Sequence, residues 1–103
     1  MIEKEVKVIK VSASTPVTSL TGSILNVLKT GKETVELRAI GAGATSQMYK
    51  ALAKTNSAVA VRGISLFVKP GFDTVYEEVD GEQKEKTVVV ARIVLMWGDC
   101  IGY

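Results

Sequence analysis

The stretch of sequence that decides the fold lies at residues 35–52 and reads VELRAIGAGATSQMYKAL. In its first part, Val35, Leu37 and Ala39 alternate with charged residues, which predicts a half-buried strand. Its last part places Met48 and Leu52 on one apolar helical stripe. Between the two parts stands Gly-Ala-Gly, and glycine allows both a tight turn and a close backbone approach. The stretch therefore predicts a strand that turns sharply into a helix.

The Gly41-Ala42-Gly43 corner has two interpretations. The first N–H groups of the following helix have no partner within the helix, so the corner is a ready site for an anion. Alternatively, it is a compact turn without a ligand. It is no nucleotide-binding fingerprint, because it lacks the third glycine of a dinucleotide motif and the Gly-Lys-Ser/Thr of a P-loop. The residues leave both interpretations open.

Two helices are predicted, each between two strands. Valine and isoleucine predict a first strand at residues 4–12. The first helix has Thr15 as its N-cap, Pro16 in its first position and Gly31 as its C-cap. After a second strand at residues 35–40, the second helix runs from Ala44 to Asn56.

The last third of the chain predicts a long hairpin. A third strand at residues 64–69 is interrupted by Pro70-Gly71, which indicates a bend or bulge at a sheet margin. An extended arm reaches its tip at Asp80-Gly81, and a fourth strand returns over residues 87–97. The order β-α-β-α-β-β predicts an α/β two-layer sandwich, in which two helices cover one face of a small mixed four-stranded sheet. We expect a single domain over residues 1–103.

The chain has no histidine, which restricts its chemistry. Histidine is the commonest general base and the commonest metal ligand. Cys100 is the only cysteine, so neither a disulfide within the chain nor a Cys/His zinc site is expected. No paired carboxylates or activated nucleophile stand out. We therefore expect no enzyme activity, no metal and no cofactor.

Charge and hydropathy indicate the compartment. The net charge of +2 permits nucleic-acid binding without requiring it. The longest apolar run, at residues 88–97, is broken by Arg92 and is too short to cross a bilayer as a helix. The first residues mix both charges and lack the apolar segment of a signal peptide. We expect a cytoplasmic protein that does not enter a membrane.

The predicted fourth strand is apolar on both faces. One face carries Ala91 and Ile93, and the other carries Val90 and Val94 with Arg92 between them. Because two helices on one side leave the other side open, this strand calls for a second cover. We expect a homodimer or higher homo-oligomer to supply it. The alternative is that some of these side chains are singly exposed.

Residues 10–53 carry the marks of a known family. The marks are Lys-Val-Ser at 10–12, Arg-Ala-Ile-Gly-Ala-Gly-Ala at 38–44, and then Gln47 and Lys50. With the Asp-Gly-Glu turn at 80–82, the chain resembles the stage V sporulation protein S family of bacteria, whose role in sporulation is regulatory. That family is similar in fold to the Alba proteins, which are small dimeric binders of DNA and RNA.

The resemblance implies an Alba-like fold with a nucleic-acid surface at the strand-one loop, the strand-two corner and the hairpin arms of a dimer. The candidate binding residues are Lys10, Ser12, Ser14, Thr15, Arg38, Gly41, Ala42, Gly43, Thr45, Ser46 and Lys50. Alba proteins carry a basic pair before the first helix and an arginine–glycine–arginine corner. This chain has Ser14-Thr15 and Ile40-Gly41-Ala42 there. Binding is therefore expected to be weak, or to use neutral donors and backbone N–H groups.

The charged candidates also have ordinary explanations. Arg38 is expected to face away from the helices, where it meets phosphate or pairs with Glu36 or Glu33. Lys50 and Lys54 lie opposite the apolar stripe, where a solvated helix face is usual and a phosphate contact is the alternative.

The predicted hairpin arm is acidic, with five acids against two lysines between residues 76 and 86. This excess counts against insertion into a DNA minor groove and suits a protein partner or a solvated edge. The sequence thus supports three hypotheses. They are a dimeric DNA- or RNA-binding regulator, a protein-interaction or assembly module without a nucleic-acid ligand, and a binder of a small anion at the start of the second helix.

Overall fold

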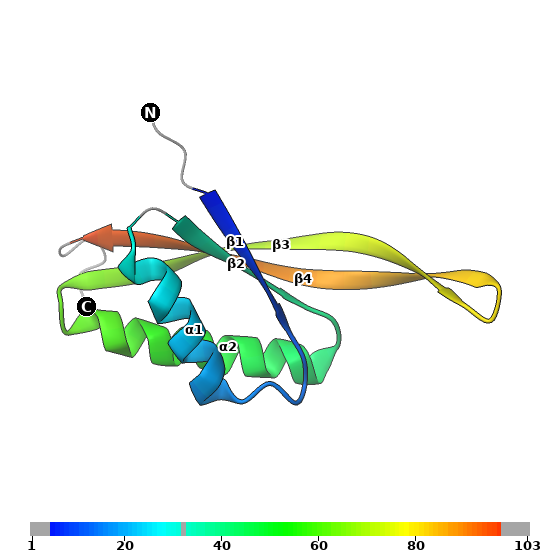
Figure 1. Ribbon diagram of the computed structural model, residues 1–103, viewed down its shortest axis with the longest axis horizontal. Helices are drawn as coiled ribbons and strands as arrows, with labels where there is room; N and C mark the ends of the chain where they lie inside the picture. The colour runs from blue at the N-terminus through cyan, green and yellow to red at the C-terminus, as the bar shows by residue number, and fades with distance from the viewer. Residues whose placement is uncertain (1–4, 32, 98–103) are drawn as a thin grey trace.

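The computed structural model describes residues 5–31 and 33–97. Its elements follow the expected order β-α-β-α-β-β (Figure 1). They are β1 (Glu5–Val11), α1 (Val17–Lys29), β2 (Glu33–Ala39), α2 (Ala42–Ala60), β3 (Ile64–Val79) and β4 (Glu82–Trp97). The predictions for Cys100 and the tail at 98–103 lie outside the described residues.

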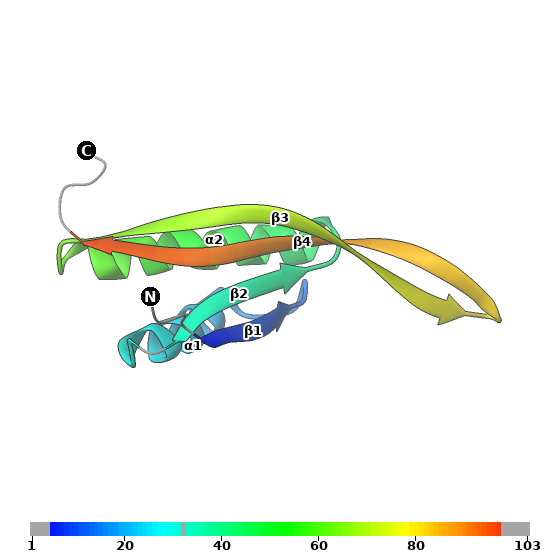
Figure 2. The ribbon, with the colours of Figure 1, turned by 90° about the horizontal axis from the view of Figure 1, so that it is seen from above.

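The strands form one mixed four-stranded sheet in the order β1-β2-β4-β3. β1 and β2 are parallel, with Ile9 opposite Leu37, so their connection must cross over, and α1 provides that crossover. β2 and β3 each pair with β4 in antiparallel fashion. The β3–β4 arm continues beyond the ends of the helices and of the other two strands (Figure 2).

Both helices cover the same face of the sheet (Figure 1), as expected for two layers. The core between the layers is closed by apolar side chains from every element. The largest fully buried ones are Ile24, Val35, Leu37 and Ile93. The buried hydroxyl of Thr55 donates to the Ala51 carbonyl at 2.8 Å, so this polar group is satisfied within α2.

The second helix is longer than the predicted Ala44–Asn56 at both ends. Gly43 adopts helical conformation instead of remaining in the turn, so α2 begins at Ala42. At the other end, the Asn56 side chain accepts a hydrogen bond from the Leu66 N–H at 3.2 Å and does not stop the helix. Val59 is buried, so the extra turn adds apolar contact that favours continuation.

The predicted capping of α1 is wrong by one residue. Pro16 is the N-cap, and no side chain caps this helix. The Thr15 side chain bonds within the loop and not to the helix, because its Oγ1 accepts a hydrogen bond from the Ser12 N–H at 2.9 Å. Its hydroxyl therefore closes the loop before the helix. At the far end, Gly31 has φ of 69°, the left-handed conformation expected of a glycine that ends a helix.

The predicted interruption of the third strand is also wrong. β3 runs unbroken through Pro70, which pairs with Ala91. The proline is tolerated because β3 lies at the edge of the sheet. The tip is as expected, since Asp80 and Gly81 both have positive φ and form a two-residue hairpin turn.

Candidate nucleic-acid interface

The β1–α1 loop and the β2–α2 corner lie side by side. This follows from the parallel pairing of β1 with β2, because the carboxyl ends of parallel strands meet at one edge of the sheet. Two contacts join the segments. The Gln47 side chain donates to the Thr15 carbonyl at 2.8 Å, and Gly43 packs against Ala13. The structure thus brings the predicted loop residues and corner residues to one place.

Each glycine of the corner has a structural reason to be glycine. Gly41 has φ of 90°, a conformation that side chains disfavour. A Cβ atom at Gly43 would lie 2.9 Å from the Cβ atom of Ala13, closer than real Cβ contacts. The compact-turn interpretation therefore accounts for both glycines without a ligand.

The first turn of α2 is nonetheless open to an anion. No side chain caps it, and it contains no acidic residue. The Thr45 hydroxyl turns back to the Gly41 carbonyl at 2.8 Å and leaves the first amides of the helix uncovered. Such amides, together with the helix dipole, favour negative charge.

The β1–α1 loop supplies a cluster of hydroxyl groups. The Ser12 Oγ lies 3.1 Å from the Ser14 Oγ and 3.0 Å from the Thr15 Oγ1. These serine side chains are exposed. Hydroxyl groups donate or accept as their surroundings require, so the cluster can turn toward a phosphate oxygen.

Most of the predicted residues line one of two hollows, whereas Ser14, Thr15 and Gly43 line neither. Lys10, Ser12 and Arg38 line the first, together with Tyr76 and Lys86 of the arm. The second is lined by Gly41, Ala42, Thr45, Ser46, Tyr49, Lys50, Thr87 and Val89. The two groups do not share a hollow, so one phosphate would not contact both Arg38 and Lys50.

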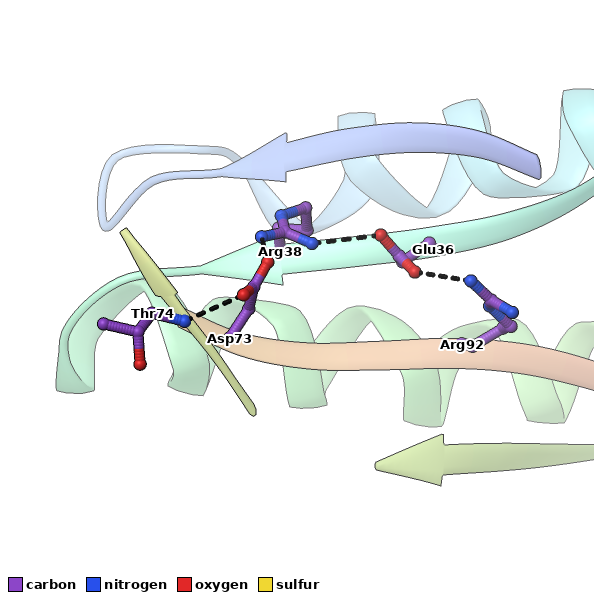
Figure 3. A network of polar contacts seen from close by, with 5 residues as sticks. All are labelled: Glu36, Arg38, Asp73, Thr74 and Arg92. Carbon is purple, nitrogen blue, oxygen red and sulfur yellow. Dashed lines mark hydrogen bonds and ion pairs between the residues drawn. The ribbon is translucent and has the colours of Figure 1, made fainter. Parts of the chain in front are cut away.

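Arg38 is held in a chain of ion pairs on the sheet face opposite the helices (Figure 3). Its Nη2 lies 2.5 Å from Asp73 Oδ2, and its Nη1 lies 3.2 Å from Glu36 Oε2. Arg92 Nη2 joins the other oxygen of Glu36 at 2.9 Å. The predicted pairing with Glu36 is therefore confirmed, and Arg38 faces away from the helices as expected.

The ion pairs shift the pKa values of Arg38, Glu36 and Asp73. Hydrogen bonds to Asp73 and then to Glu36 raise the pKa of Arg38. The hydrogen bond from Arg92, aided by the one from Arg38, lowers the pKa of Glu36. The hydrogen bond from Arg38, with that from the Thr74 N–H, lowers the pKa of Asp73. Both carboxylates are thus stabilised in their charged form.

Sequence reasoning missed the ion pairs that the arm makes with cations of the first hollow. Asp73 is 35 residues from its partner Arg38, and only the register of three strands brings them together. Lys86 likewise pairs with Glu77 across the hairpin. The Asp-Gly tip was the one available signal, because it fixes the register of β3 against β4.

The sheet face opposite the helices is largely uncovered. Val6, Val8, Ile40 and Val94 on this face are each at least 40% exposed. On β4, Val94 is exposed on this face, Val90 is half-buried and Val88 is buried. Among the described residues, the side of β4 that faces away from the helices is therefore covered only in part.

Residues 5–31 and 33–97 show neither a metal cluster nor a membrane-spanning helix. In that part of the chain, no group of three or more His, Cys, Asp and Glu residues is placed to hold a metal ion. Neither described helix combines the length and apolar character needed to span a membrane.

These features define a small two-layer α/β protein with a long two-stranded arm and a surface site of backbone amides, hydroxyls and guanidinium groups. A sequence model of the family called stage V sporulation protein S (SpoVS) matches residues 7–96. The chain belongs to this family. The resemblance carried by residues 38–44 is thereby confirmed.

Proposed function

We propose that the protein is a regulator that binds DNA or RNA through the β1–α1 loop and the β2–α2 corner of a dimer. The observation that carries this proposal is the first hollow, where Lys10, Ser12 and Arg38 meet. Ammonium, hydroxyl and guanidinium groups are the donors that proteins use on nucleic-acid phosphates.

The start of α2 provides the second contact. Its uncapped amides lie beside Thr45, Ser46 and Lys50 in the second hollow. Two phosphates of one strand would occupy the two hollows. Contacts of this kind hold the backbone and carry no sequence information directly.

Affinity through this surface is modest. The loop offers hydroxyls in place of a basic pair, and Arg38 is already paired with two carboxylates. Each phosphate that is neutralised contributes about 0.9 to the slope of log affinity against log salt for duplex DNA, and about 0.7 for a single strand. A site with Lys10, Arg38 and Lys50 therefore gives a slope of at most about 2.7 per protomer on duplex DNA.

Dimerisation follows from the uncovered sheet face. Val6, Val8 and Val94 are exposed apolar side chains on this face, which water solvates poorly. A second copy that covered these valines and left the Lys10 and Arg38 end of the face open would double the number of phosphate contacts. Sedimentation at micromolar concentration tests this part of the proposal, and a clean monomer would contradict it.

The binding experiment titrates labelled single-stranded RNA, single-stranded DNA and duplex DNA at low and moderate salt. The proposal predicts affinity that falls with salt and weakens in Arg38→Ala and Lys50→Ala. Arg62→Ala and Lys29→Ala are the matched controls, because both residues border a different hollow beside α1 and the end of α2. No binding at low salt, or equal losses in the controls, would defeat the proposal.

A protein-interaction or assembly module is the second candidate. It is favoured by Phe72, which is 81% exposed on the arm, and by the uncovered sheet face. This candidate predicts self-association or partner binding without any nucleic-acid affinity. The small-anion hypothesis predicts that inorganic phosphate alone binds at α2 as tightly as an oligonucleotide does.

A further inference from the structure

The acidic hairpin arm is the feature that the proposed function leaves unexplained. Glu77 lines the first hollow, and Asp73 pairs with Arg38, which also lines it. Asp73 Oδ2 lies 2.5 Å from Arg38 Nη2, and Glu77 forms an ion pair with Lys86 Nζ. Asp73 lies opposite Val88, just beyond the part of β4 that pairs with β2, and Glu77 lies opposite Lys84, nearer the tip of the arm.

These ion pairs neutralise most of the positive charge in the hollow. The cations that line it are Lys10, Arg38 and Lys86. Arg38 and Lys86 are paired with the arm acids. Lys10 has no ion pair among the residues that the structure describes. An incoming phosphate therefore meets one unpaired cation in this hollow instead of three.

The arm carboxylates differ from Glu36 in how firmly they are held. Glu36 is 12% exposed and bridges two arginines, as a structural ion pair does. Asp73 and Glu77 are each 53% exposed, and each pairs with one cation. Ion pairs that are half exposed to water are weak, so another anion can replace them. A phosphate presents the same charge-assisted acceptors to a guanidinium group.

We propose that Asp73 and Glu77 occupy the positions that phosphates would take on Arg38 and Lys86, and so compete with nucleic acid for these two cations. The arm then lowers the affinity for nucleic acid, because a nucleic-acid strand must displace both carboxylates in order to bind. This inference rests on the proposed function.

The competition has a measurable size. Removing the two carboxylate charges frees Lys86 and one side of the Arg38 guanidinium group, which stays paired with Glu36. The modest strength of exposed ion pairs sets a gain of about two- to fivefold in affinity for each. Lys86 then adds one phosphate contact to those of Lys10, Arg38 and Lys50, which steepens the salt dependence by about 0.9 in slope on duplex DNA.

The test compares two double variants of the same composition. Asp73→Asn with Glu77→Gln removes the competing charges, and Asp80→Asn with Glu78→Gln removes equal charge elsewhere on the arm. In the wild type, Asp73 Oδ1 accepts a hydrogen bond from the Thr74 N–H at 2.9 Å. Asparagine at 73 keeps an oxygen that can accept the same hydrogen bond. Asparagine at 80 tolerates the positive φ of that position.

Two readouts keep the inference separate from the proposed function. One is affinity for the labelled oligonucleotides, and the other is the salt concentration that elutes each variant from immobilised heparin, a general polyanion. The first variant is expected to bind oligonucleotide about four- to twenty-five-fold more tightly than the wild type and to elute later than the second variant. Adding Arg38→Ala to the first variant is expected to remove most of that gain.

The outcomes are distinguishable. Equal elution of the two double variants would overturn the inference, whether or not the wild type binds nucleic acid. Later elution of the first variant without any oligonucleotide binding would support the competing carboxylates and defeat the proposed function. Tight oligonucleotide binding by the wild type with no gain in the first variant would leave the function standing and defeat the inference.

Discussion

Replacing Gly43 by alanine tests the contact between α2 and the β1–α1 loop. A glycine-to-alanine change inside a helix ordinarily stabilises a protein by about 0.5–1 kcal/mol. Here the new Cβ would lie 2.9 Å from the Ala13 Cβ. Forcing a methyl group into a closely packed contact costs about 1–3 kcal/mol. We expect Gly43→Ala to lower the free energy of unfolding by up to about 2.5 kcal/mol, once the helix gain is subtracted.

Gly22→Ala is the matched control for this change. Gly22 also lies within a helix, but a Cβ atom built there meets no heavy atom within 4 Å. We expect Gly22→Ala to raise the free energy of unfolding by the ordinary amount of about 0.5–1 kcal/mol. Urea unfolding of the two variants measures the difference, which should be about 1–3 kcal/mol in favour of Gly22→Ala.

A rescue experiment completes the test. Ala13→Gly removes the atom that the new methyl group would strike, so the pair Gly43→Ala with Ala13→Gly should recover most of the loss. If Gly43→Ala stabilised the protein as much as Gly22→Ala, the close contact between loop and helix would be refuted.

Three further predictions concern the corner and the ion pairs. Gly41→Ala should cost about 1–3 kcal/mol of unfolding free energy in urea, because φ of 90° strains any side chain. Glu36→Gln should cost about 1–2 kcal/mol by the same assay, since it weakens charged hydrogen bonds to Arg38 and Arg92. The folded-state pKa values of Glu36 and Asp73 lie below their ordinary 4.5 and 3.8, so their stabilisation is present above those values and is lost as pH falls through the lowered pKa values. Thermal unfolding between about pH 6 and pH 2 measures this loss of stability, which should be smaller in Glu36→Gln than in the wild type.

Each of these predictions has a contradicting result. Wild-type stability in Gly41→Ala would mean that the turn relaxes without strain. Unchanged unfolding in Glu36→Gln would mean that the ion-pair chain contributes no stability. An acid profile identical in wild type and Glu36→Gln would show that this carboxylate does not carry the pH dependence.

The element order was predictable because hydrophobic periodicity is local. Val35, Leu37 and Ala39 alternate within one strand, and all three are buried as the alternation requires. The Asp80-Gly81 tip was predictable for the same reason, since two adjacent residues determine a hairpin turn.

What could not be predicted depends on contacts between distant segments. Whether Gly43 belongs to the turn or to the helix depends on Ala13, which the fold brings against it. Pro70 breaks a strand in isolation but is tolerated at the edge that the sheet order gives to β3. Of the two partners of Arg38, Glu36 could be predicted because it is two residues away. Asp73 could not, because it is 35 residues away.

The most direct test of the proposed interface follows backbone amide resonances while the protein is titrated with a short oligonucleotide. The account predicts that the shifted amides gather in the Ser12–Thr15 loop and the Gly41–Ser46 corner, the two segments that Gln47 and Gly43 hold together. It predicts also that the shifts fade as salt is raised. Shifts confined to other segments, or none at a salt concentration low enough for phosphate contacts to form, would contradict it.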